Sequence, residues 1–176
     1  MKKEISIGTR RKAILVALIV VGALTLFMCV GAIGATQQDV SVSATINATL
    51  ELNMPTTSVT WTGAQAIPGT TVTAPITATI NSNKAYALKV TQNHVLTGTG
   101  TTPPTIASAN FTFGATNPTG GTYNAPAGTE FGTAVRVIEG ARGSGLSTTI
   151  TYSLTVPWDQ APDTYTATHT YTATQP

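Results

Sequence analysis

The sequence predicts an all-β protein, an immunoglobulin-like or jelly-roll-like β-sandwich of about 7–9 strands, preceded by an N-terminal hydrophobic export helix. Three observations support this class. Apolar and polar residues alternate over several stretches, which is the period of a half-buried strand. Residues 36–176 contain 34 threonines, a residue that favours strands over helices. Turn signals rich in Gly, Pro and Asn separate the alternating stretches, and no helical period occurs outside the N-terminal segment.

The N-terminal segment, residues 1–35, has the pattern of an export signal. Five of the nine Lys and Arg residues precede an uncharged, mainly apolar run at residues 13–35. A cationic start, an apolar run and small residues at Gly34 and Ala35 are typical of a cleaved secretory signal. The run is also long enough to span a bilayer, so an uncleaved anchor is the alternative. In both cases we expect residues 36–176 to be a single secreted, extracellular domain at the cell surface, touching a membrane only through residues 13–35.

The charge outside the export segment excludes nucleic acid as an expected partner. Residues 36–176 carry four cations and six acids, a net charge of −2, so the formal charge of +2 comes from the export segment. No basic surface for a phosphate backbone is therefore expected. These residues also contain no cysteine, so we expect packing and strand hydrogen bonds, rather than disulfides, to hold the domain.

The longest alternation covers residues 39–53, with the sequence DVSVSATINATLELN. As a single strand, residues 40–52 would span about 43 Å, roughly twice the usual length. A long strand near the start of the exported chain either begins its own sandwich or adds to the open edge of a neighbouring copy, and the sequence leaves both options open. The apolar positions that would contact the neighbour in the second case are Val40, Val42, Ala44, Ile46, Ala48, Leu50 and Leu52.

The other strands are expected in order along the chain. We predict them at residues 58–62, 70–80, 86–90, 111–113, 131–137, 147–156 and 165–173, with loops at 96–104 and 117–128 and a corner at 157–163. Pro75 lies on the polar face of its strand. Because proline has no N–H, we expect a sheet edge or a bulge at that point. In the last strand, His169 shares one face with Tyr165 and Tyr171.

Residues that carry chemistry are few and dispersed. His94 and His169 lack the close spacing of a zinc site, and we interpret His169 as a packed side chain. The six carboxylates form no recognisable glycosidase pair, and no Gly-x-Ser-x-Gly elbow is present. Asp159 and Asp163 share the corner at residues 157–163, where capping of the turn is favoured over calcium binding. The sequence therefore predicts no enzyme, no cofactor and no metal site.

Three aromatic residues are candidates for stacking on sugars, as in carbohydrate-binding sandwiches: Trp61, Tyr123 and Trp158. Trp158 follows Pro157 in the corner, and we interpret it instead as a plug that packs against the end of the sandwich. A stacking role for these residues would make cell-wall or matrix polysaccharide the partner.

Several short motifs resemble a known family. The export segment is followed by an alternating strand, then by the sequences IPGTTV at residues 67–72 and YALKV at residues 86–90. This order resembles the secreted matrix-fibre proteins of the TasA and camelysin type and the archaeal bundling pili. The ending, PDTY at residues 162–165 followed by an alternating strand, is similar to the closing strand of WxL-type surface sandwiches. The resemblance implies a surface structural protein that polymerises with itself by strand donation.

Three functions follow from these observations. The first is a subunit of an extracellular filament, pilus or matrix fibre, with the strand at residues 40–52 either donated to a neighbour or used within its own subunit. The second is a cell-surface module that binds glycan or cell wall. The third is a hydrolase whose histidine or acids gather in a cleft.

Overall fold

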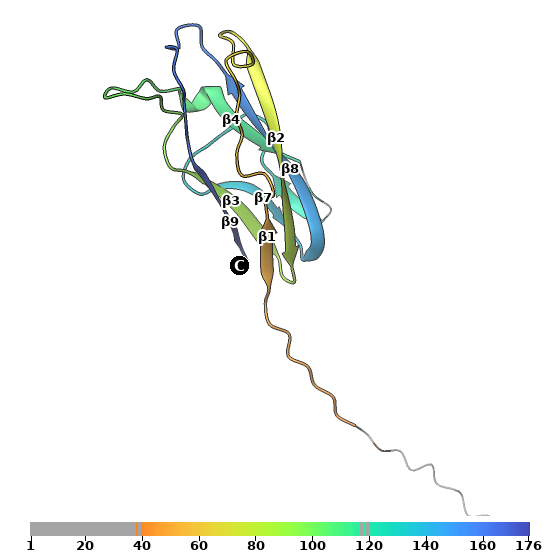
Figure 1. Cartoon of the computed structure of the whole chain (residues 1–176). Coiled ribbons are helices and arrows are strands. Elements are labelled where there is room, and N and C mark those ends of the chain that lie inside the picture. Colours follow the sequence, from red (N-terminus) through yellow and green to blue (C-terminus); the bar gives the residue numbers. More distant parts are fainter. Residues whose placement is uncertain (1–37, 39, 117, 119) are drawn as a thin grey trace, which may run out of the picture. The chain divides into compact units, whose positions relative to one another are not determined.

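The computed structural model describes residues 38, 40–116, 118 and 120–176. Its contacts divide the chain into two compact units, Met1–Thr45 and Ile46–Pro176. Every described strand belongs to the second unit (Figure 1). The predicted export helix lies outside the described residues. In the part of the chain that is described, no helix is both long enough and apolar enough to cross a membrane.

The second unit is all-β, as predicted, with nine described strands and one short 3₁₀ helix, η1 (Ser108–Asn110). The strands are β1 (Leu50–Asn53), β2 (Thr71–Ser82), β3 (Tyr86–Gln92), β4 (Phe111–Ala115), β5 (Gly121–Asn124), β6 (Thr129–Glu130), β7 (Val135–Gly140), β8 (Gly143–Thr155) and β9 (His169–Thr174).

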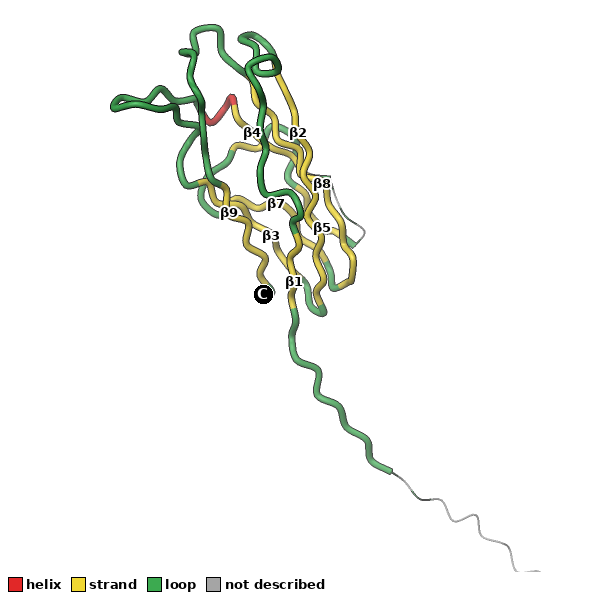
Figure 2. The backbone as a smooth tube through the Cα atoms, in the orientation of Figure 1, coloured by secondary structure: helices red, strands yellow, loops and turns green. Residues whose placement is uncertain are grey.

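The strands form two antiparallel sheets that pack as a sandwich (Figures 1 and 2). One sheet has the order β1-β2-β8-β4-β6, and the other has the order β5-β7-β3-β9. The strands β1 and β9 are therefore edge strands of opposite sheets, and residues of the two strands contact each other. The long strands β2 and β8 pair from Thr71 with Thr155 to Ser82 with Gly143, which makes them the main ladder of the fold.

Alternation along the strands places one side of each sheet in the core. In β8, buried and more exposed positions alternate from Leu146 to Leu154, as expected for a strand with one face in the core. Phe113 of β4 is fully buried and stacks on Phe131 with ring centroids 4.7 Å apart. The largest fully buried side chains are Phe113, Ile80, Leu88, Ile138, Ile150, Val90, Val137 and Thr148, from both sheets.

The prediction of one long strand over residues 39–53 is wrong for most of its length. Only Leu50–Asn53 form a strand, and residues 40–49 are exposed and outside any sheet. The pairing explains this difference, because Leu50 lies opposite Ser82, the last residue of β2. Residues before Leu50 have no further β2 residue to pair with. Alternation specifies the two faces of a strand, but a strand also needs a partner edge.

Other boundaries differ for the same reason. Residues 58–62 are not a strand, whereas β5 lies within the expected loop at 117–128, where β7 supplies a partner. The strand expected at residues 131–137 is Val135–Gly140. The last strand begins at His169 rather than Tyr165, because His169 lies opposite Gln92, the final residue of β3.

Candidate functional site

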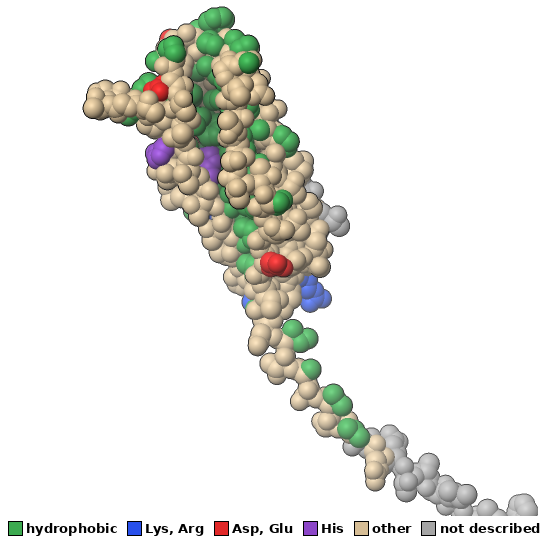
Figure 3. Space-filling model, in the orientation of Figure 1, with side chains coloured by type: hydrophobic (Ala, Val, Ile, Leu, Met, Phe, Trp, Pro, Cys, Tyr) green, Lys and Arg blue, Asp and Glu red, His purple; other side chains and the backbone are tan. Residues whose placement is uncertain are grey.

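A groove of about 1390 Å³, with an apolar floor and walls that carry many threonines, lies between the two sheets. One wall is formed by residues 54–63, which follow β1, and the other by residues 160–171, which lead into β9. Its floor includes Ile76, Phe111 and Tyr152, which belong to the core of the sandwich. Figure 3 shows hydrophobic side chains between the two walls, with a histidine beside them. The groove therefore opens onto the sandwich interior.

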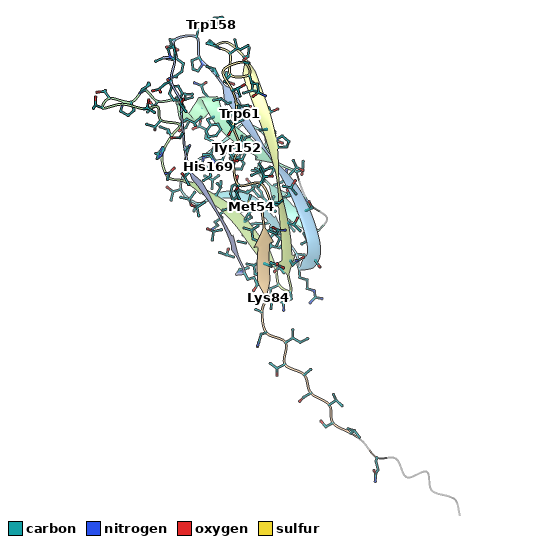
Figure 4. All side chains as sticks on the ribbon, in the orientation of Figure 1. Met54, Trp61, Lys84, Tyr152, Trp158 and His169 are labelled. Carbon is teal, nitrogen blue, oxygen red and sulfur yellow. The ribbon has the colours of Figure 1, made fainter. Side chains whose placement is uncertain are left out.

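An aromatic cluster lies at the groove around His169. The imidazole stacks on Phe131 with ring centroids 4.0 Å apart, and on Phe111 and Tyr152 at 5.5 and 5.4 Å. Trp61, from the opposite wall, meets Phe111 edge-on at 6.2 Å. These contacts confirm the interpretation of His169 as a packed side chain. Figure 4 shows Trp61, Tyr152 and His169 in the same region of the sandwich.

A chain of hydrogen bonds connects three polar groups in this cluster. The hydroxyl oxygens of Tyr171 and Tyr152 are 2.9 Å apart, and Tyr152 Oη lies 3.0 Å from His169 Nδ1. Burial lowers the pKa of His169 from 6.5 to about 4. Burial also raises the pKa of Tyr152 and of Tyr171. The imidazole and both phenols are therefore neutral at physiological pH.

The five-stranded sheet has an open edge along part of β2. The strand β1 covers β2 only from Thr79 to Ser82, so residues 71–78 of β2 pair with β8 on one side and with no described strand on the other. Pro75 lies in this stretch, opposite Thr151. Because proline has no N–H to donate, it is tolerated at such an edge, and the predicted edge at Pro75 is confirmed. The open edge is about 27 Å long.

Residues 54–61, here called the strap, run between β1 and the turn at residues 62–66. Among the described residues, no backbone hydrogen bond involves the strap. Only side chains fix it in place, chiefly the half-buried Met54, Val59 and Trp61, which pack against the core. The strap therefore lines the groove without completing the sheet.

The predicted contact residues of the long strand fall into two groups. Leu50 and Leu52 lie in β1 and are half-buried against the core of their own subunit. Residues 40–49, here called the tail, are all exposed where they are described. Its large apolar side chains Val40, Val42 and Ile46 are 83%, 86% and 84% exposed. Ala44 and Ala48 lie on the same parity and are exposed as well.

The aromatic residues proposed for sugar stacking do not gather at one place. Trp61 lies at the groove, Tyr123 lies under the Arg136 guanidinium at 5.2 Å, and Trp158 lies at the far end of the sandwich (Figure 4). Trp158 is 82% exposed, so its interpretation as a packed plug is wrong. Its indole lies over Gly69, and a Cβ at that position would be 2.5 Å from Trp158 Nε1.

The acidic residues with described partners make polar contacts in loops and strands. The Asp163 carboxylate accepts hydrogen bonds from Thr99 N, Thr99 Oγ1 and Thr164 N at 2.7–2.8 Å, and these bonds lower its pKa. This is the capping role expected at the corner. Glu139 pairs with Arg136 at 2.9 Å. Within the described residues, no three His, Cys, Asp or Glu side chains lie close enough together to hold a metal ion.

Comparison with known proteins gives little further guidance. No family model matches the chain, and a search of curated proteins finds no match. Among solved structures, the chain is similar to a family 123 glycoside hydrolase from Clostridium perfringens, with 13% sequence identity and a TM-score of 0.45. The similarity covers 72% of this chain, and the matched region spans a quarter (25%) of the hydrolase. A likeness at this level carries no conclusion about activity.

Proposed function

We propose that the protein is an extracellular structural protein, the subunit of a surface filament, pilus or matrix fibre. In this proposal the tail of one subunit adds to the open edge of β2 in the next subunit, and its apolar side chains enter the groove. Leu50 and Leu52 remain in β1 of their own subunit. Two features of the subunit together support the proposal. Val40, Val42 and Ile46 are exposed and lie on the same side of the alternating tail, and the domain has an open strand edge beside a groove with an apolar floor.

The dimensions support this pairing. Asn47 and Thr49 hydrogen-bond to Asn83 of their own subunit, so the free part of the tail is residues 40–46. These seven residues span about 23 Å in an extended conformation and cover most of the about 27 Å of open edge. Full burial of an aliphatic side chain contributes about 1.5–3 kcal/mol. Val40, Val42 and Ile46 together would contribute about 4.5–9 kcal/mol before the cost of ordering the tail, and the main-chain hydrogen bonds of one more ladder would add to this.

The export segment supports an extracellular location for this assembly. Residues 1–35 have the pattern of a secretory signal, and the domain after them is rich in threonine and poor in charge. Self-assembly outside the cell requires no cofactor, and the partner is a second copy of the chain.

Electron microscopy tests the proposal directly. Residues 36–176, incubated at high concentration, are expected to form regular fibres in negative stain. A variant with Val40, Val42 and Ile46 all replaced by Ser is expected to remain monomeric with unchanged circular dichroism, because these side chains are exposed in the isolated subunit. Dispersed wild-type monomers at high concentration would contradict the proposal.

The second candidate function is a cell-surface glycan-binding or wall-binding module, which the exposed indole of Trp158 favours. An exposed indole is a suitable platform for a sugar ring. This function predicts that polysaccharide quenches or shifts Trp158 fluorescence in a monomer, and that Trp158→Ala abolishes the binding. Polysaccharide binding by the wild type, without fibres, would favour this function over assembly.

A further inference from the structure

Two ring nitrogens at the groove have no hydrogen-bond partner. Trp61 Nε1, Tyr86 Oη and His169 Nε2 are the buried side-chain polar atoms that lack a partner among the described residues. Trp61 and His169 both line the groove, on opposite walls, whereas Tyr86 does not line it. A buried polar atom without a partner is destabilising, so such atoms are uncommon in folded proteins. Both side chains line the groove but the two nitrogens are themselves buried, so an occupant of the groove supplies their partners when the rings turn toward it.

The chemistry of the two nitrogens specifies the occupant. The indole N–H of Trp61 is a donor only, so it requires an oxygen acceptor. His169 Nε2 can take either role, because its role depends on the direction of the Tyr171–Tyr152–His169 chain. When Tyr152 donates to Nδ1, the neutral imidazole carries its proton on Nε2 and donates. When Nδ1 donates to Tyr152, Nε2 accepts.

A strand backbone offers both kinds of partner along its edge, since every residue other than proline carries one carbonyl acceptor and one N–H donor. A purely apolar ligand would fill the groove and leave both nitrogens unpaired. We propose that Trp61 Nε1 and His169 Nε2 recognise the main chain of the inserted tail, which makes the groove selective for an extended peptide. This inference rests on the proposed function, and it adds the recognition of the tail backbone to the burial of its side chains.

A peptide-binding experiment tests the inference on the full chain, purified in a mild detergent. The host protein carries Val40→Ser, Val42→Ser and Ile46→Ser, so that its own tail does not compete. The probe is a fluorescent synthetic peptide of residues 39–49. In this host, His169→Phe keeps an aromatic ring on Phe131 and removes both ring nitrogens. Trp61→Phe keeps an aromatic ring at the wall and removes the N–H.

Each of these two variants is expected to weaken peptide binding about 2- to 12-fold, the effect of one lost hydrogen bond. The denaturant midpoint without peptide is expected to stay near that of the host for Trp61→Phe, because the deleted nitrogen has no partner among the described residues of the subunit. For His169→Phe the midpoint is expected to fall, because this variant also loses the hydrogen bond between Nδ1 and Tyr152. Tyr86→Phe is the matched control. It removes the third unpartnered polar atom, which lies away from the groove beside Gly140, and it is expected to leave the peptide affinity unchanged.

The outcomes separate this inference from the proposed function. Peptide binding that is equal in the host, His169→Phe and Trp61→Phe would overturn the recognition role and leave assembly by strand donation standing. The same conclusion follows if Tyr86→Phe weakens binding as much as the groove variants. No binding of the peptide to the host itself would overturn the proposed function and this inference together.

Discussion

Replacement of Val42 by Ser is the sharpest test of how the tail functions. The Val42 side chain is 86% exposed in the isolated subunit, so its loss removes almost no intramolecular contact. Surface substitutions of this kind usually change the free energy of unfolding by less than about 0.5 kcal/mol. In the proposed assembly, by contrast, the same side chain is buried in the groove of the next subunit. The effect of the substitution on assembly should therefore be large, and its effect on folding small.

The magnitude follows from the burial of one valine. Full burial contributes about 1.5–3 kcal/mol, which corresponds to an increase of about 10- to 150-fold in the critical concentration for assembly. The assay is sedimentation of fibres over a range of subunit concentrations, with the critical concentration read from the soluble fraction. Thermal unfolding of the monomer, followed by circular dichroism, verifies that the fold is unchanged.

Thr45→Ala is the matched control for this experiment. It also removes a β-branched side chain from the exposed tail, but from the opposite parity, which faces away from the groove in the proposed assembly. Its critical concentration should lie within about threefold of the wild type, as for a surface change of about 0.5 kcal/mol. Equal effects of the two substitutions, or no effect of Val42→Ser, would refute the reasoning from parity and burial.

Three further predictions concern the fold itself. Phe113→Ala should lower the free energy of unfolding by about 3–5 kcal/mol in guanidinium titration, because Phe113 is fully buried; a loss below about 1 kcal/mol would contradict its place in the core. His169 hydrogen-bonds to the phenol of Tyr152, which bonds to that of Tyr171, and burial lowers the pKa of His169 to about 4. The unfolded chain therefore binds this proton first as the pH falls from 6.5 to 4, and stability should fall over that window by about 1–2 kcal/mol after allowance for solvent screening at the groove. His169→Phe should remove this pH dependence, and a dependence that persists in the variant must come from another group. Gly69→Ala should destabilise the protein by about 1–2 kcal/mol and shift the Trp158 emission, since Gly69 has φ of +81° and its new Cβ would meet the indole; unchanged emission would show that Trp158 does not cover Gly69.

The sequence was sufficient to predict the fold class and most of the strands. Alternation and threonine content predicted an all-β sandwich, because the side-chain period of a strand is visible without any partner. The same alternation identified the core faces of β2 and β8, and the missing N–H of Pro75 indicated the sheet edge. The packed role of His169 and the bond from Thr164 N to Asp163 also followed from local sequence, whereas the bonds from Thr99 to Asp163 join segments 64 residues apart.

The tertiary structure decided where each strand begins and ends, and what the groove contains. Residues 40–49 alternate as regularly as Leu50–Asn53, yet only the latter find β2 residues opposite them. The groove joins residues far apart in the chain, with Trp61 and His169 on opposite walls and Phe111 on the floor. Pairing and burial depend on which distant segments become neighbours, so local periodicity does not specify them. For this reason the sequence determined the apolar edge of the tail, and only the fold showed that this edge is exposed and that the domain has an open strand edge and a groove.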